Sequence, residues 1–491
     1  MSPVLAALLS FTTAAHASPM EFYGFGARKM GRGGGGVALA EGAESILVNP
    51  AALAGQRYPQ ASIGFVGIDT EFEPIPSVWW DTNRDGLVDE TDAPLEMGPD
   101  YDAVQGFMLG VTRPIGTMFS FGLGLFLPMD RLLRLQTFEP QLPTYFLYAN
   151  RAQRYELAIG AGFRPKWGLS VGGGFQMIPR ARYKLTATLD VTVSAAEAGD
   201  SAASDVVGVG LDVHEMSLDL VPGFAPIVAL HWDAGEAFPV LDGLEVGASW
   251  RGDAGLPVDV DIDLQVNART EAIGDLNATV LPLYLGISLG VFDHYTPSQL
   301  NLGVAYEIAD TVVLTFDAKR TAWDQMTPSI AKVTHLTVNG AGLEIPDGSA
   351  TDGNPFDVQL QATWSPRAGT ELKLPRFKLW PRWGEWEIDV QGGVGYEPTP
   401  LVSQSTATAL LDGNRTIFAL GLGFEHDDPF RRAGNERRVR LDGFFQYHVV
   451  QSGALDRGAP ETPTAGYSVD GSPIPIGGHL LAAGVQWGLE Y

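Results

Sequence analysis

Hydrophobic and polar residues alternate with a period of two along much of the chain. Between residues 118 and 127, one set of alternate positions is Phe119, Phe121, Leu123, Leu125 and Leu127, and the other set is mostly small or polar. Such alternation predicts β-strands with one apolar face, because successive side chains of a strand point to opposite faces. The pattern recurs in Tyr155–Phe163, Tyr183–Val193, Leu244–Trp250 and Val258–Leu264.

Two all-β architectures fit this alternation. A soluble sandwich would point its apolar residues inward. Here the second face is rich in Gly, Ser, Thr and Asp, which suits a polar lumen, and segments near 10 residues match a tilted transmembrane strand of about 9–11 residues. No segment reaches the roughly 20 apolar residues of a transmembrane helix. We therefore favour a transmembrane antiparallel β-barrel over a sandwich.

The last residues of the sequence strengthen this interpretation. Alternate positions from Leu481 to Tyr491 are apolar, and the sequence stops on an aromatic residue. A last strand would be an exposed edge in a soluble fold, whereas in a closed barrel it pairs with the first strand. The segment also resembles the terminal assembly signal of outer-membrane proteins, which implies the barrel assembly machinery as a partner.

Short turns and long polar stretches separate the alternating segments, as in outer-membrane barrels. One short turn is Arg113–Gly116. The long stretches are Thr70–Asp102, Ser194–Asp212, Ala268–Asn277 and Asn339–Asn354. The pattern alone does not fix the number of strands.

Residues 1–17 have the form of a secretory signal peptide. An apolar stretch from Val4 to Ala15 ends in Ala15-His16-Ala17, a small-x-small cleavage pattern. No Lys or Arg precedes the stretch, and a buried N-terminal helix is the alternative. We expect cleavage after Ala17, leaving residues 18–56 as the first segment of the mature chain and residues 57–491 as the barrel.

Composition narrows the class of protein further. The chain of 491 residues is 45% hydrophobic, which excludes a disordered protein, and it has no Cys, so disulfides do not stabilise it. The formal net charge of −26 argues against nucleic acid as a partner, because phosphates would be repelled. It also argues against a polybasic membrane anchor.

The segment 18–56 contains Gly31, Gly33 and Gly36, which formally match the Gly-x-Gly-x-x-Gly dinucleotide fingerprint. No strand precedes these glycines and no βαβ unit surrounds them, so we discount the fingerprint. Glycines at this density instead allow tight turns and close packing. Because the segment is too small to fold alone, we expect it to fill the barrel lumen as a plug, or hatch.

An ordered series of motifs resembles the FadL-type long-chain fatty acid transporter family of outer-membrane proteins. The motifs are Gly24–Gly36, Asn49-Pro50-Ala51, Leu314–Trp323, Gly395–Pro400, Leu411–Arg415 and Leu420–Gly423. The resemblance implies a barrel of about fourteen strands with an N-terminal hatch in its lumen. It also implies a place in the outer membrane of a Gram-negative bacterium, contact with outer-membrane lipid, and diffusive uptake of fatty acids or other hydrophobic compounds.

The resemblance places no ligand-contacting residue, so the ligand-binding residues and the hydrophobic substrate stay unknown at this point. Arg28 or Lys29 could pair with a carboxylate ligand, but we favour a salt bridge to an Asp or Glu of the lumen. Asn49 can hydrogen-bond backbone groups at a turn, and Pro50 fixes φ. We expect this pair to hold the hatch near the barrel wall.

The polar stretch after the first strand contains a candidate calcium site. Residues 69–102 include 11 acidic residues and one basic residue, and we expect this loop to lie outside the cell. Its oxygen ligands have the spacing of a calcium loop, in which Gly86 would make the sharp turn. The ligands would be Asp81, Asn83, Asp85, the Leu87 carbonyl, Asp89 and Asp92. An ordinary acidic loop is the alternative, and no cofactor other than this structural Ca²⁺ is expected.

Two other functional classes are weighed. An enzyme is not favoured, because no His-Glu-x-x-His motif occurs and single residues such as His214, His231 or His448 are ordinary lumen side chains. A secretion or surface-assembly component with the same architecture is the main alternative to uptake. Trp380, Trp383 and Trp386 lie beside Lys378 and Arg382, which fits either an interfacial belt or an aromatic turn.

Overall fold

The structure is a computed structural model, and we describe the residues whose positions it defines. These are residues 26–39, 41–76, 78–82, 88–95, 103–129, 142–145, 148, 155–193, 206–270, 280–326, 332–340, 343–345, 358–378, 385–404, 408–427, 438–456, 467–469 and 472–491. The predicted signal peptide, three predicted calcium ligands (Asn83, Asp85 and Leu87) and Trp380 and Trp383 lie outside them. No helix among the described residues is long and apolar enough to cross a membrane.

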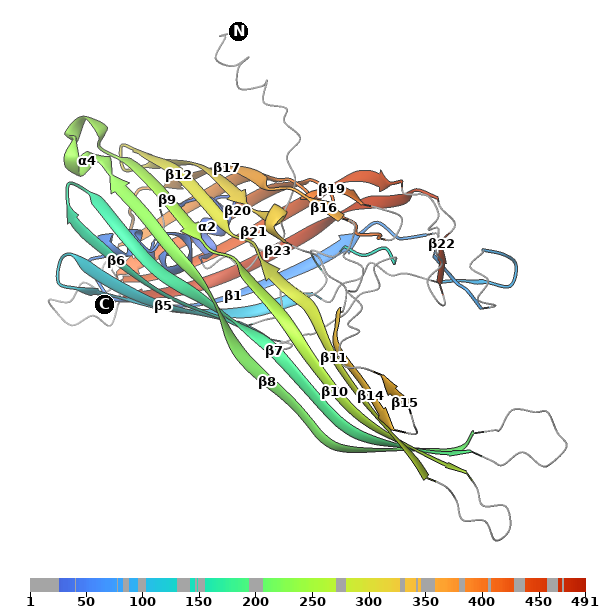
Figure 1. Cartoon of the computed structure of the whole chain (residues 1–491). Coiled ribbons are helices and arrows are strands. Elements are labelled where there is room, and N and C mark those ends of the chain that lie inside the picture. Colours follow the sequence, from blue (N-terminus) through green and yellow to red (C-terminus); the bar gives the residue numbers. More distant parts are fainter. Residues whose placement is uncertain are drawn as a thin grey trace.

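Fourteen antiparallel strands form a closed barrel (Figure 1), which confirms the predicted fold class. Around the ring they are β1 (Gln60–Phe72), β4 (Val104–Ile115), β5 (Phe119–Pro128), β6 (Glu156–Lys166), β7 (Leu169–Val193), β8 (Val206–Asp233), β9 (Leu244–Arg251), β12 (Gln299–Ile308), β13 (Val312–Thr321), β17 (Thr363–Lys373), β18 (Trp386–Glu397), β20 (Arg415–Asp427), β21 (Arg438–Leu455) and β23 (Ile474–Glu490). The ring closes between the last strand and the first, where Trp487 pairs with Ile63.

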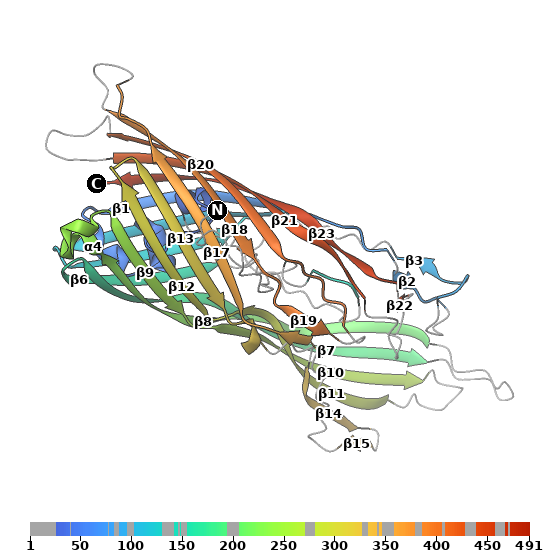
Figure 2. The same ribbon diagram turned by 90° about the horizontal axis from the view of Figure 1, so that it is seen from above.

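The period-two alternation separates the two faces of the wall as predicted. On β5, Phe119, Phe121 and Leu123 are 54%, 43% and 41% exposed on the outer face, whereas Ser120 is 2% exposed on the lumenal face. The outer face is the lipid-facing side, since a barrel without free edges satisfies its backbone hydrogen bonds within a bilayer. Ring strands are joined by 2–12 residues at the end that holds α4 (Ala234–Ala237) and the C-terminus, and by 12–47 residues at the other, outer end (Figure 2).

Two strands of the ring, β7 and β8, continue beyond its outer end, where the same sheet branches away from the ring. There β7 leaves β6 and pairs in parallel with β10 (Ala254–Thr270). The branch continues through β11 (Val280–Thr296), β14 (Lys332–Gly340) and β15 (Leu343–Ile345), so its strands pair in the order β8-β7-β10-β11-β14-β15. We use the name sheet extension for β10, β11, β14 and β15 together with residues 178–193 of β7 and residues 206–222 of β8 (Figure 1).

The sheet extension corrects part of the sequence interpretation. Tyr183–Val193 and Val258–Leu264 are strands, but they pair with each other outside the ring. The stretches expected to be loops are shorter, because β8 already begins at Val206, β10 reaches Thr270, and β14 and β15 include residues 339–340 and 343–345. Alternation identifies a strand with two different faces, but it does not identify the neighbour with which that strand pairs.

Residues 26–56, which we call the N-terminal segment, precede β1 and consist of short helical turns. These are α2 (Ala27–Gly31), η1 (Gly42–Glu44), α3 (Ser45–Val48) and η2 (Ala52–Gly55). The turn α2 contacts β18, β20, β21 and β23, whereas η1, α3 and η2 contact β1, β4, β5, β6 and β7. Strands from several sides of the ring thus surround the segment, and most of its residues are buried.

The remaining elements are small. The outer connections contain β2 (Val78–Trp80), β3 (Ala93–Pro94) and β22 (Tyr467–Val469), which form one sheet, and β16 (Val358–Leu360) and β19 (Leu401–Gln404), which form another. Two further 3₁₀ turns are η3 (Pro239–Leu241) and η4 (Trp323–Gln325).

Candidate functional site

A buried carboxylate of the barrel wall binds the beginning of the N-terminal segment. Glu371 of β17 accepts a hydrogen bond from Arg28 Nε at 2.8 Å and from Arg32 Nη1 at 3.2 Å. Arg28 also pairs with Glu41 within the segment. The predicted salt bridge of Arg28 to a lumenal acid is therefore confirmed. With its side chain fully buried, Glu371 is a strong anchor, because removal of one partner would leave uncompensated buried charge.

Asp317 and Asn49 bind the middle of the segment through its backbone. Asp317 of β13 accepts hydrogen bonds from the N–H groups of Gly36 and Val37, at 2.7 and 2.8 Å. The Asn49 amide donates to the Val37 carbonyl at 2.9 Å and to the Leu230 carbonyl of β8 at 3.1 Å. Asn49 therefore bridges two parts of the segment and one strand of the wall.

Glycines of the wall allow the backbone of the segment to approach the strands. A Cβ atom on Gly172 would lie 2.2 Å from the Ala51 nitrogen, and one on Gly393 would lie 2.3 Å from the Arg32 carbonyl carbon. Within the segment, Gly33 and Gly36 have φ of +80° and +119°, which L-residues rarely adopt. The glycine-rich lumenal face noted in the sequence thus holds the segment in van der Waals contact.

A second buried charge cluster lies on the lumenal face of neighbouring strands. Glu397 of β18 pairs with Arg367 of β17 and Arg415 of β20, and its carboxylate lies 3.6 Å from Lys319 Nζ of β13. Arg367 also donates to the Gly33 carbonyl at 3.2 Å, which joins this cluster to the N-terminal segment. Mutual pairing keeps these charges compensated inside the lumen.

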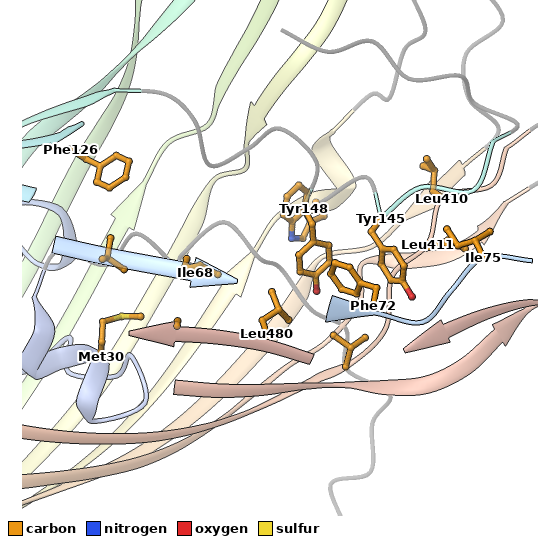
Figure 3. Packing of buried hydrophobic residues seen from close by; sticks show 14 of the residues in the cluster. Met30, Ile68, Phe72, Ile75, Phe126, Tyr145, Tyr148, Leu410, Leu411 and Leu480 are labelled. Atoms are coloured by element: carbon orange, nitrogen blue, oxygen red, sulfur yellow. The ribbon is translucent and has the colours of Figure 1, made fainter. Parts of the chain in front are cut away.

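An apolar cluster lies in the barrel interior on the outer side of the segment (Figure 3). It runs from Met30 of the segment, through Ile68 and Phe126 on the wall, to Tyr145 and Leu410 of the outer connections. Tyr145 stacks on Phe72 with ring centroids 4.0 Å apart, and its hydroxyl donates to the Gly477 carbonyl at 3.1 Å. Barrel lumens are ordinarily polar, so an apolar interior that begins at the outer loops needs an explanation.

The opposite side of the segment borders a polar cavity. This cavity has a volume of about 700 Å³, and charged side chains from both the segment and the wall line it, among them Arg28, Glu41, Glu44, Arg440 and Asp442. Desolvation raises the pKa of Glu44 to about 7. Because the pKa is raised on docking, Glu44 stabilises the docked segment most at acidic pH, and this contribution is lost as the pH rises through about 7. The N-terminal segment therefore borders the apolar cluster on one side and this charged cavity on the other.

The described part of the predicted calcium loop brings its ends together. Asp92 accepts hydrogen bonds from the N–H groups of Thr82 and Asp89, both at 3.2 Å, and Asp81 is buried. Among the described residues, no group of three or more acidic, His or Cys side chains could hold a metal ion. Since positions 83–87 lie outside the described residues, the calcium site stays a prediction.

One tryptophan of the predicted aromatic cluster and one hydrolase-like sequence match both lie in strands. Trp386 begins β18 and packs on His426 with ring centroids 4.3 Å apart. Gly286–Gly290 fits the Gly-x-Ser-x-Gly pattern of hydrolases, but it lies inside β11, which pairs with β10 and β14. A nucleophile elbow requires a strand-to-helix turn, so this match carries no enzymatic meaning.

Comparison with known proteins identifies the family. The sequence profile described as outer membrane protein transport protein (OMPP1/FadL/TodX) matches residues 8–470. The chain belongs to this family. The members are outer-membrane channels for hydrophobic compounds, so the resemblance read from the sequence is confirmed, as is the outer-membrane location. This is a family of transport channels and not of enzymes.

Several solved structures resemble this FadL/TodX family member. A FadL homologue of Pseudomonas aeruginosa is 15% identical over 97% of this chain and 99% of its own, with a TM-score of 0.49. The toluene transporter TodX of P. putida is 15% identical over 95% and 99%, with a TM-score of 0.47. The monoaromatic hydrocarbon channel CymD is 14% identical over 97% and 98%, with a TM-score of 0.46. No curated protein matches the chain.

Several residues of this site were not predicted, although each stands out at a lumenal position of its strand. Phe126 is the one large side chain among the lumenal positions of its otherwise small-residue strand face, and it joins the apolar cluster. Glu371, Asp317 and Arg367 are charged residues at alternate, lumenal positions of transmembrane strands. A charge on the inner face of such a strand signals a partner inside the lumen, although the sequence does not say which one.

Proposed function

We propose that this channel takes up hydrophobic compounds, such as long-chain fatty acids or aromatic hydrocarbons, by diffusion, and that the N-terminal segment is its hatch. The observation that carries the proposal is the apolar cluster inside the lumen, which extends from the outer connections to Met30 of the segment. Apolar cargo is stabilised there because it leaves water, by about 25 cal/mol for each Å² of apolar surface.

The proposal requires the N-terminal segment to move. Beyond Met30 the backbone of the segment packs against wall glycines, and the space behind it is lined by charged side chains. Cargo in the apolar cluster can shift the position of the segment only if it binds the displaced arrangement more tightly than the docked one. The contacts that hold the docked arrangement, above all those of Glu371, set the free energy that cargo binding must offset.

Glu371→Gln should loosen the hatch. The substitution removes the carboxylate shared by Arg28 and Arg32, so the buried Arg32 loses its ion pair with Glu371 while Arg28 keeps its pair with Glu41, at a cost of about 3–5 kcal/mol to the docked state. We expect faster uptake of a labelled fatty acid or of labelled toluene by intact cells that express the variant, and more frequent ion-conducting events in planar bilayers.

Glu307→Gln is the matched control, because Glu307 pairs with Lys373 at the partly exposed inner rim. It should behave as wild type in both assays. If Glu371→Gln also behaves as wild type, Glu371 does not control a hatch. If neither protein raises the uptake of hydrophobic probes above that of cells lacking the chain, uptake itself is refuted and the secretion alternative gains support.

We also propose that the loop 81–92 binds one Ca²⁺. The support is the ligand spacing together with the hydrogen bonds that Asp92 accepts from the N–H groups of Thr82 and Asp89, which bring the two ends of the loop together. Calorimetry on the purified protein should give saturable Ca²⁺ binding that Asp85→Ala abolishes, because that change deletes a ligand oxygen. Glu90→Gln removes a charge of the same loop at a non-ligand position and should leave binding intact. Equal loss in both variants would mean that the loop is merely acidic.

A further inference from the structure

The sheet extension has one apolar face, and we infer that this face lies against the lipid of the outer leaflet. The inference rests on the location of the protein in the outer membrane, and it is independent of which compound the channel carries. Its starting point is β8, whose exposed apolar residues do not end where the ring ends. From the ring outward they are Leu230, Val228, Phe224, Leu220, Leu218 and Met216.

These residues occupy a single face of β8. Pairing with β7 runs without a register shift from Trp232 to Glu215, so alternate positions keep the same side over the whole length. Val228 lies in the ring, where its side chain faces lipid and is 53% exposed. Leu218 and Met216, at 51% and 69%, belong to the same series in the sheet extension. The lipid-facing surface of the barrel therefore continues onto the sheet extension.

The opposite face of the sheet extension is polar. Lys184 of β7 donates to Glu215 of β8 at 2.9 Å, and Asn267 of β10 donates to Asp190 of β7 at 2.9 Å. A sheet with one polar and one apolar face rests on an apolar phase with one side and faces water with the other. A sheet that merely projected into water would have no physical reason for this separation.

The apolar face is several strands wide. The parallel register pairs Ala187 with Leu264 and Leu189 with Val266. Partners in a ladder point to the same side of a sheet, so β10 widens the apolar face of β7. β7 continues from residue 177 to 193, which at about 3.3 Å per residue is roughly 50 Å. An apolar patch of that extent in water would promote aggregation, so a covering phase is required.

The junction between barrel and sheet extension directs this face toward the membrane. Ile178, Ala225 and Ala254 form a separate buried cluster there, and Pro179 pairs with Pro222 next to it. Figure 1 shows the sheet extension leaving the barrel obliquely, away from the long axis of the barrel. When a strand of the wall splays outward, its outer face turns toward the plane of the membrane. Continuity with the lipid-facing wall thus identifies lipid as the occupant.

Single-cysteine labelling tests the inference, because the chain has no Cys. Leu218→Cys probes the apolar face, Ser217→Cys is the adjacent control on the polar face, and Val228→Cys is the reference within the ring. Each full-length variant would be spin-labelled in vesicles of phosphatidylcholine and phosphatidylglycerol. Relaxation by oxygen, which is concentrated in lipid, would be compared with relaxation by a water-soluble nickel chelate.

The label at 218 should resemble the label at 228, with an oxygen-to-nickel ratio several-fold above that at 217. A ratio at 218 equal to that at 217 would overturn the inference. Protection of 218 from both reagents, together with disulfide cross-linking between two copies of Leu218→Cys, would also overturn it by identifying a second copy as the occupant. A normal signal at 228 establishes that each preparation is folded and inserted.

Discussion

Deletion of Trp487–Tyr491 should abolish assembly of the barrel. These residues lie at the end of β23, which pairs with β1 on one side and β21 on the other, and the Tyr491 N–H donates to the Pro59 carbonyl. Without them, backbone groups of both neighbouring strands face lipid without partners. Each such group costs several kcal/mol in the hydrocarbon region, so the open ring cannot persist there.

The measurement is migration of outer-membrane fractions on detergent gels with and without boiling. Wild type should shift on heating, and the truncated chain should be missing from the fraction. Trp487→Leu is the control, because it keeps an apolar outward side chain and every backbone partner of β23. A truncated protein that still reached the membrane and shifted on heating would mean that the ring closes without this part of β23.

The strands of the ring were predictable from the sequence, because the requirement to face lipid acts on each strand separately. Each wall strand must present apolar residues to lipid at every second position, so Phe119–Leu127 and Leu481–Tyr491 carry the pattern in their own residues. The sheet extension obeys the same local rule, and for this reason Tyr183–Val193 was indistinguishable from a wall strand. Its parallel pairing with β10 joins residues 77 positions apart, a property that period-two alternation does not encode.

The candidate site was predictable to a smaller degree. The sequence indicated that Arg28 pairs with a lumenal acid, and chemistry justified this, because a buried cation needs a carboxylate. The identity of Glu371 depends on how β17 lies relative to α2, which only the closed ring determines. The same holds for the apolar cluster, since Met30, Phe126 and Leu411 come together from three distant parts of the chain.

Deletion of Met20–Leu47 should convert the channel into an open pore. The deleted stretch includes the groups that bind Glu371 and Asp317 of the wall, whereas the ring strands and their hydrogen bonds stay complete. Eight strands enclose only side chains and about sixteen enclose a water-filled channel, so about fourteen strands around glycine-rich walls should admit water and ions. The lumenal charges would then be solvated, which removes the reason for their pairing with the segment.

We expect steady ion conductance in planar bilayers where wild type is closed, with normal heat-modifiable migration as the proof that the barrel has assembled. Asn49→Ala, which removes the bridge between the segment and β8 but leaves the segment in place, should give an intermediate result with brief openings. Comparing the conductance of wild type, Asn49→Ala and the deletion distinguishes two explanations for why the wild-type channel is closed. If the N-terminal segment blocks the lumen, conductance rises from wild type through Asn49→Ala to the deletion. If the outer connections block it, through the apolar cluster that Tyr145 and Leu410 complete, the deletion stays closed and the hatch proposal fails.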